Sequence, residues 1–226
     1  MSEHLSVVIP VYADDKALSA LLRQLKHRGF SVVVVDGASS PMTRGIVDAS
    51  GYEVRYLPSS AGRGQQIALA IAEVQTPWVW VLHADSLPSE EAFVFMQSLT
   101  HTTQHGWGRF CVAIPQLRLV AFMMNLRSRL TKICTGDQGM FFAVPQLVAI
   151  GGFPAQPLME DIEVSRQLKK ARFPFLARSE TVLTSPRRWL RRGTIRTILQ
   201  MWWYRLRYFL GADAHTLFEG YYSKKS

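Results

Sequence analysis

The sequence has little cysteine and no long apolar run. Its two cysteines, Cys111 and Cys134, match no zinc spacing and are too few for a disulfide framework. We therefore expect a reducing compartment, with both thiols packed as small core residues. No segment approaches about 18 uninterrupted apolar residues, and the N-terminus lacks the basic region of a signal peptide. These absences predict a cytoplasmic protein without a membrane-spanning helix.

Charged residues are also scarce, and acidic ones most of all. They make up 19% of the chain, with 17 Asp and Glu against 26 Lys and Arg, so the formal net charge is +9. Such an excess favours anionic partners such as nucleotides, nucleic acid or an acidic membrane surface, although net charge also serves solubility. A hydrophobic content of 48% in 226 residues is enough for one domain with a sizeable core.

The first half of the chain alternates apolar runs with amphipathic stretches. Strands are predicted at 5–11, 31–35, 52–57 and 78–82, and helices at 16–27, 43–49 and 64–74. This alternation predicts an α/β fold with a mostly parallel sheet flanked by helices. Ligands bind beyond the carboxyl ends of the strands in such sheets, so Asp36 and Asp85, which each follow an apolar strand, are expected to converge.

The second half is less regular. Apolar runs predict strands at 110–114 and 139–144, and the spacing of apolar residues predicts helices at 117–133 and 160–171. The final third, from Pro186, is basic and aromatic.

The carboxylates after the strands each allow two interpretations. Asp85 is well placed to hold a divalent cation, since Mg²⁺ often takes one or two carboxylates together with substrate phosphates. It equally suits the N-cap of a following helix. Asp36 could accept hydrogen bonds from a base or ribose, or serve as a turn residue before Gly37.

Cationic side chains suggest where an anion binds. Arg63 lies between two glycines where a loop enters a helix, and such junctions favour anions. The segment 187–192 carries four arginines around Trp189. Arginines grip diphosphates with bidentate bonds, but such a cluster is also typical of a solvated or lipid-facing surface.

Two further segments are candidates for the acceptor side. Glu160 and Asp161 are adjacent carboxylates at a predicted helix start, where one serves either as a general base or as a complement to the helix dipole. The polar turn Gly136, Asp137 and Gln138 either lines an acceptor pocket or is an ordinary loop.

Together these segments resemble family-2 glycosyltransferases, which have the GT-A fold. The likeness runs from Ser6 to about Trp189. It is carried by V-V-I-P-V-Y at 7–12, V-V-D-G-A-S at 34–39, A-G-R-G at 61–64, H-A-D at 83–85, M-E-D at 159–161 and S-P-R-R-W at 185–189. The motifs H-A-D, G-D-Q-G, P-L-M-E-D and T-S-x-R-R-W are similar to those of one bacterial subgroup.

The resemblance implies an inverting, metal-dependent transfer of a sugar from a nucleotide diphosphate donor, with a UDP-sugar favoured, to an acceptor hydroxyl. Asp161 is implied as the base, with Glu160 beside it, and Asp85 as the ligand of Mg²⁺ or Mn²⁺. The implied donor-binding residues are Pro10, Val11, Tyr12, Asp36, Arg63, His83, Ala84, Asp85, Arg188 and Trp189. Gly136, Asp137 and Gln138 are assigned to the acceptor pocket. The chain departs from the family pattern at His83, which replaces the first Asp of D-x-D, and at Ala13, where relatives have Asn.

We expect a GT-A catalytic domain at 1–190, with a nucleotide-binding half at 1–88 and an acceptor half at 89–190, followed by a basic aromatic helical segment at 191–226. The stretch Thr194–Leu210 is too short and too charged to span a bilayer. It either lies in a membrane interface or packs on the catalytic domain with its arginines outward. The first alternative would put the protein at the inner face of the cell membrane, where it could meet a lipid-linked acceptor.

Three other functions remain open at this point. A nucleotidyltransferase would also use a Rossmann-like sheet and a metal carboxylate, but its glycine-rich loop follows the first strand, and residues 10–15 contain no glycine. A basic nucleic-acid-binding protein fits the charge but lacks a recognisable motif, and no nucleic acid partner is expected. His83 in the metal motif is compatible with a non-catalytic GT-A protein.

Overall fold

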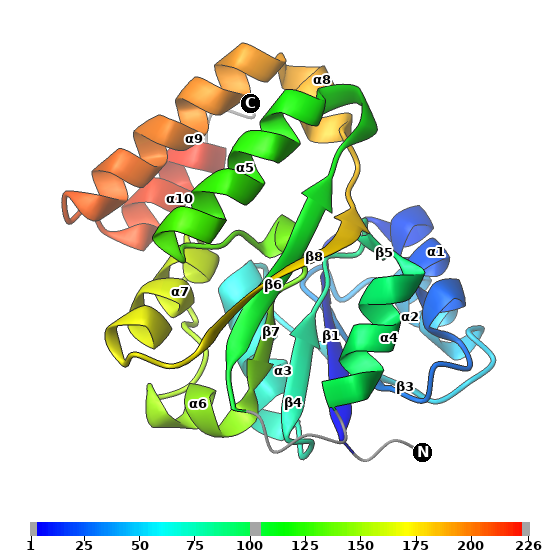
Figure 1. Cartoon of the computed structure of the whole chain (residues 1–226). Helices are drawn as coiled ribbons and strands as arrows, with labels where there is room; N and C mark the ends of the chain where they lie inside the picture. The colour runs from blue at the N-terminus through cyan, green and yellow to red at the C-terminus, as the bar shows by residue number, and fades with distance from the viewer. Residues whose placement is uncertain (1–3, 100–104, 223–226) are drawn as a thin grey trace.

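The computed structural model describes residues 4–99 and 105–222, apart from the side chains of 188, 191, 192, 221 and 222. An eight-stranded sheet in the order β3-β2-β1-β4-β7-β6-β8-β5 forms its centre (Figure 1). The strands are β1 (Leu5–Val11), β2 (Ser31–Asp36), β3 (Val54–Pro58), β4 (Trp78–Val81), β5 (Leu87–Pro88), β6 (Trp107–Ala113), β7 (Phe141–Ala143) and β8 (Phe175–Leu183).

The half of the sheet built by the first part of the chain is parallel. Strand β1 pairs in parallel with β2 and β4, and β2 pairs in parallel with β3. Strand β7 runs antiparallel to both β4 and β6, while β8 is parallel to β6 and antiparallel to the short β5. The carboxyl ends of β1, β2 and β4 therefore meet at one edge, as the sequence predicts.

Helices cover both faces of the sheet (Figure 1). They are α1 (Asp15–Leu25), α2 (Pro41–Asp48), α3 (Arg63–Glu73), α4 (Glu90–Leu99), α5 (Arg118–Thr131), α6 (Val144–Ala149), α7 (Glu160–Lys170), α8 (Arg187–Arg192), α9 (Thr194–Phe209) and α10 (Ala214–Tyr222). Two 3₁₀ turns, η1 (Pro115–Leu117) and η2 (Gly136–Gln138), lie on either side of α5.

Successive side chains of β1 point into two different cores. Val7 and Ile9 pack with the buried leucines of α1 and with Phe93 of α4, whereas Val8 packs with Ile67 of α3 and Leu147 of α6. Both faces of the strand are buried, which explains why it is apolar throughout and shows no alternation.

Most elements predicted in the first half are confirmed, within a few residues at their ends. The N-cap interpretation of Asp85 is wrong, because β5 intervenes and the side chain of Ser89 accepts from the backbone N–H of Ala92 at the start of α4. The strand predicted at 139–144 is shorter, since α6 begins at Val144 with Pro145 in its first turn.

The C-terminal helices pack against the rest of the chain. Ile198 and Met201 of α9 share a small core with Val112 of β6, Ile114 just after it and Met124 of α5. Figure 1 shows α5 and α9 running beside each other at one end of the sheet. A second small core joins Tyr204 of α9 and Leu217 of α10 to Leu158, just before α7. These contacts bring α9 to the carboxyl edge of the sheet.

Candidate active site

Asp85 follows β4 and lines a cavity at the carboxyl edge of the sheet. The cavity encloses about 590 Å³, including its mouth, and is also lined by Arg63, His83, Asp137, Thr184, Ser185, Trp189 and Met201. Burial raises the pKa of Asp85, and the negative charges of Asp137 and Asp14 add to the rise against the opposing effect of His83. A cation in this cavity would relieve the cost of the buried carboxylate.

His83 links two sides of the site. Its Nδ1 lies 3.2 Å from Oδ1 of Asp137, and its Nε2 lies 3.4 Å from Nη1 of Arg63. Because arginine can only donate, Nε2 accepts and the Nδ1–H donates to Asp137. Gly136 makes room for the ring, since a Cβ there would lie 2.3 Å from Nε2 of His83. His83 is 9% exposed, so it organises the floor of the site.

Arg63 and Glu160 form a buried ion pair at the first turns of α3 and α7. Nε of Arg63 donates to Oε1 of Glu160, whose side chain is 1% exposed. Burial acts to lower the pKa of Arg63, but the charges of Glu160, Asp161 and Asp137 outweigh it and raise the pKa above its usual value. Gly64 permits this contact, because a Cβ there would lie 2.2 Å from the backbone oxygen of Gln156.

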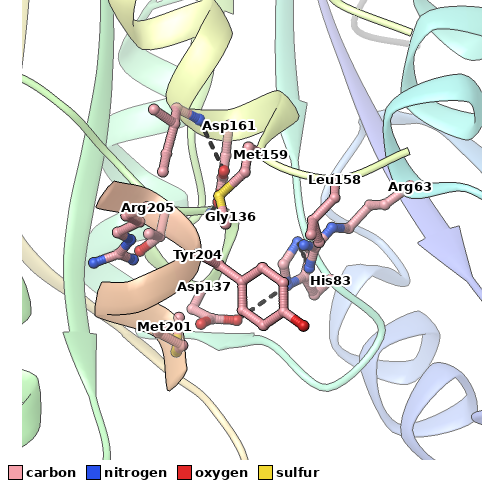
Figure 2. Close-up of a pocket in the computed structure, with 12 residues that line it drawn as sticks. Arg63, His83, Gly136, Asp137, Leu158, Met159, Asp161, Met201, Tyr204 and Arg205 are labelled. Carbon is pink, nitrogen blue, oxygen red and sulfur yellow. Dashed lines mark hydrogen bonds and ion pairs between the residues drawn. The ribbon is translucent and has the colours of Figure 1, made fainter. Parts of the chain in front are cut away.

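Asp161 lines a second cavity, which measures about 540 Å³ when the open space at its mouth is included. Its Oδ2 accepts from the backbone N–H of Gly136 at 3.0 Å, and its Oδ1 accepts from Ile162 at 2.8 Å. Arg63, His83, Asp137 and Met201 line both cavities. The two cavities therefore adjoin, with Asp85 in one and Asp161 in the other. Figure 2 shows Asp161 and Gly136 on one side of Asp137 and His83 on the other.

The three residues of the predicted acceptor turn, Gly136, Asp137 and Gln138, do not all face the cavity. Gly136 and Asp137 line the Asp161 cavity. Gln138 points away, with 0% exposure, and its Nε2 donates to the side chains of Asn125 and Ser128 on α5. Gln138 also closes a capping box with Thr135, so it fixes the turn rather than lining the cavity.

Asp36 lies at the end of β2 but lines neither cavity. Its side chain is 0% exposed and accepts from the backbone N–H groups of Ala38 and Ser40 and from the hydroxyl of Tyr56. These bonds hold the turn after β2. Gln66 ties the adjacent strand ends together, since its Nε2 donates to the backbone oxygens of both Val11 and Val35.

The other predicted donor-binding residues have different surroundings. Pro10 and Val11 are buried within β1, Tyr12 is 63% exposed, and Ala84 packs in the core beneath the loop. Trp189 of α8 lines the Asp85 cavity. The side chain of Arg188 lies outside the part of the chain that the structure describes.

Several residues of the site are not among those predicted. Met201, Tyr204 and Arg205 line the Asp161 cavity from α9, together with Leu158. Arg187 pairs with Asp14 at 2.9 Å and thereby joins α8 to the loop before α1. The available signal for the α9 residues was their i, i+3, i+4 spacing, which places them on one helix face.

The residues present suit a metal ion only in part. Among residues 4–99 and 105–222 there is no group of three His, Cys, Asp or Glu side chains that could hold one. Asp85 supplies one partly buried carboxylate, which is a sufficient protein share for Mg²⁺ or Mn²⁺ if substrate oxygens complete the shell. None of the described helices meets the length and hydropathy that crossing a bilayer requires.

Comparison with known proteins assigns the fold. Residues 6–96 match the family described as "Glycosyl transferase family 2". The structure resembles a mannosyltransferase from Pyrobaculum calidifontis in complex with GDP-Man and Mn²⁺, with a TM-score of 0.64 and 17% identity over 80% of this chain and 56% of that one. It also resembles S. aureus TarS 1–349, with a TM-score of 0.64 and 17% identity over 81% and 61%. No relative is found among proteins of curated function.

A more distant likeness has the same architecture. GalNAc-T7, solved with UDP, GalNAc and Mn²⁺, superposes with a TM-score of 0.61 and 11% identity over 80% of this chain and 44% of that one. The chain thus spans 56% and 61% of the length of the two solved proteins above. These likenesses establish that the chain has the GT-A fold.

Proposed function

We propose that the protein transfers a sugar from a nucleotide diphosphate donor to an acceptor hydroxyl, with inversion at the anomeric carbon. The observation that carries this proposal is the pair of adjoining cavities, with Asp85 in one, Asp161 in the other and Asp137 and His83 between them. The match of residues 6–96 to family-2 glycosyl transferases supports it. So do the structures with GDP-Man and UDP-GlcNAc among the similar folds.

The donor occupies the Asp85 cavity in this proposal, and a UDP-sugar is favoured. Asp85 would hold Mg²⁺ or Mn²⁺ in this cavity, and such an ion would supply positive charge against the negative charge that grows on the leaving diphosphate. Trp189 covers the cavity from α8, and Arg63 lends its positive charge from the shared wall. Residues from both 1–88 and 89–190 line this side, whereas residues 89–190 supply most of the lining of the acceptor side.

Asp161 acts as the general base on the acceptor side. Each of its oxygens accepts one backbone hydrogen bond, which fixes the carboxylate while leaving lone pairs for a substrate hydroxyl. The base takes the hydroxyl proton as the oxygen attacks the anomeric carbon, and one displacement gives the inverted product. Glu160, buried beside it and paired with Arg63, supports the site from below.

Replacing Asp161 tests this assignment. We expect Asp161→Asn to lower turnover about 10²–10⁴-fold, because an amide cannot take the hydroxyl proton. The amide NH2 also cannot accept one of the two backbone hydrogen bonds, but this change lies on the acceptor side, so donor affinity should change little. Asp48→Asn, on the exposed surface of α2, is the matched control. Thermal shifts with UDP-sugars, with and without Mn²⁺, report donor binding, and release of nucleoside diphosphate rather than pyrophosphate reports the reaction. Near-normal turnover in the Asp161 variant would refute the base.

The outer face of α9 supports the proposed membrane contact. This face, the α9 stripe, carries seven large apolar residues that are each more than half exposed: Ile195, Leu199, Trp202, Trp203, Leu206, Phe209 and Leu210. Neighbouring α5 exposes Leu119, Phe122, Met123 and Leu130 in the same way. An apolar stripe with tryptophan, on a helix that also carries arginine, suits an anionic bilayer surface, from which a lipid-linked acceptor could be drawn.

Vesicle binding tests the contact. We expect sedimentation with vesicles containing phosphatidylserine, weaker binding to neutral vesicles, and a loss of at least tenfold in binding for Trp202→Ser with Trp203→Ser. Met42→Ser on α2, where the side chain is 67% exposed, is a matched control that should bind as the unaltered protein does. Equal binding by the double tryptophan variant would exclude the α9 stripe as the membrane face.

A further inference from the structure

Two arginines near the Asp161 cavity lack a paired carboxylate of the kind that Arg63 has in Glu160. Arg127 of α5 and Arg205 of α9 have no carboxylate within ion-pair distance among the residues that the structure describes, whereas Arg63 is paired with Glu160. Nε and Nη2 of Arg127 are buried and make no hydrogen bond. Such groups are costly to bury, so they indicate a missing partner.

The electrostatics of the two arginines agree with this geometry. Burial lowers the pKa of Arg205 to about 10, with a further contribution from the like charge of Arg127. Burial also lowers the pKa of Arg127. The charge of Asp161 opposes both shifts, and that of Asp137 also opposes the shift of Arg205, but the pKa of each arginine stays lowered. Two cations that influence each other are thus held partly out of water, and an anion beside Arg205 would stabilise both.

The position of Arg205 assigns the anion to one cavity. Arg205 lines the Asp161 cavity but not the Asp85 cavity. In Figure 2, Arg205 and Arg63 lie at opposite ends of the residues drawn, with Asp137 between them. A donor diphosphate held near Asp85 would therefore leave Arg205 free to contact the other substrate.

We propose that Arg205, backed by the uncompensated charge of Arg127, binds an anionic group, a phosphate or a carboxylate, carried by the acceptor whose hydroxyl faces Asp161. The assignment of the anion to the acceptor rests on the function proposed above, whereas the presence of an anion site does not. An oxyanion accepts charge-assisted bonds from the accessible edge of Arg205, and its charge offsets that of Arg127 behind it. The arginines then select acceptors by charge, and Asp161 acts on the hydroxyl that this anchoring presents.

Small anions test the site in the full chain. The protein is first saturated with UDP and Mn²⁺, so that the donor cavity is filled, and its melting temperature is followed as inorganic phosphate, glycerol phosphate, acetate or glycerol is added at constant ionic strength. We expect one class of anion to raise the melting temperature and uncharged glycerol to leave it unchanged. Stabilisation by the phosphates or by acetate identifies which oxyanion the site takes.

Variants assign the effect to the arginines. Arg205→Gln should bind the stabilising anion about tenfold more weakly, Arg205→Lys should lose less, and Arg196→Gln, an exposed position on the same helix, should bind normally. Arg127→Gln is compared with its own melting temperature without anion, so that a change in folding does not obscure binding.

Two results would overturn the proposal: no anion stabilises the protein beyond sodium chloride at equal ionic strength, or Arg205→Gln keeps full affinity. Absence of a melting shift with UDP and Mn²⁺ would count against the glycosyltransferase function instead, so the two failures are distinguishable.

Discussion

Removing Arg63 and removing Glu160, the two members of the ion pair, should destabilise the protein to different degrees. Glu160 is 1% exposed and its second oxygen, Oε2, has no partner, whereas the side chain of Arg63 is 33% exposed. Removing Arg63 leaves a carboxylate in a dry site with Asp161 as a like-charged neighbour. Removing Glu160 leaves a guanidinium that reaches water and still faces Asp161 and Asp137.

The expected free energies of unfolding follow from this asymmetry. An unpaired buried charge costs about 3–5 kcal/mol, so Arg63→Met should lie in that range. Glu160→Leu should cost less, about 1–3 kcal/mol, because the arginine that remains is partly solvated. The double variant removes both charges and should lie within about 2 kcal/mol of the unaltered protein. The two changes are therefore strongly non-additive.

Urea unfolding followed by tryptophan fluorescence measures all four forms of this cycle, and melting temperatures check the order, at about 2–4 °C for each kcal/mol in a chain of this size. The reasoning fails if Glu160→Leu is the more destabilising change, or if the double variant equals the sum of the single ones within about 0.5 kcal/mol. A stable double variant that retains turnover would also remove Glu160 from the candidate catalytic residues.

Three other perturbations have defined outcomes. Gly136→Ala should displace the ring of His83, whose Nε2 would lie 2.3 Å from the new Cβ, and cost about 1–3 kcal/mol of stability with a loss of turnover, both measurable on the purified variant. Asp36→Ala should cost about 2–4 kcal/mol, because three donors lose their acceptor, while the affinity for UDP measured by calorimetry changes less than tenfold. Acidification should loosen the link from α7 to α9. Hydrogen bonds from Arg166 and then Tyr208 lower the pKa of Glu163 from 4.5 to about 2. The stability that ionised Glu163 contributes is therefore fully present above about pH 4.5 and is lost as the pH falls towards 2. Melting scans across this pH range measure the loss.

The parallel half of the fold could be predicted because its signals are local. Strands β1, β2 and β4 are short, mostly apolar runs that stop at a turn, and parallel pairing follows from the alternation of strands with helices. Strand β8 was not predicted, because Arg178 and Glu180 interrupt its apolar pattern. The two pair with each other on one face of the strand, where Arg178 also stacks 4.0 Å over the ring of Phe95. The stacking partner Phe95 belongs to α4, which is far away in the sequence.

Asp36 and Asp85 show where local signals stop being sufficient. Both follow an apolar parallel strand, so the sequence pattern predicts a ligand-binding role for each of them equally. The difference lies in their neighbours: the turn after β2 supplies two N–H groups and a tyrosine hydroxyl to Asp36, and these bonds bury its carboxylate. Asp85 lines a cavity beside other carboxylates. Which strand-end carboxylate remains available depends on turn geometry and on contacts over long sequence distances.

The two alternatives for α9 are not exclusive, because a helix has two faces. Its inner face packs on β6 and α5 and contributes Met201, Tyr204 and Arg205 to the Asp161 cavity, while the α9 stripe remains exposed. Periodicity gives the positions of such faces but not which one meets the protein. A surface bound to the stripe therefore lies one helix diameter, about 10–12 Å, from the wall of the acceptor cavity. If the acceptor is lipid-linked and carries an anionic group, it would have to cross only that distance to reach Arg205, and membrane contact and anion binding would then both depend on α9.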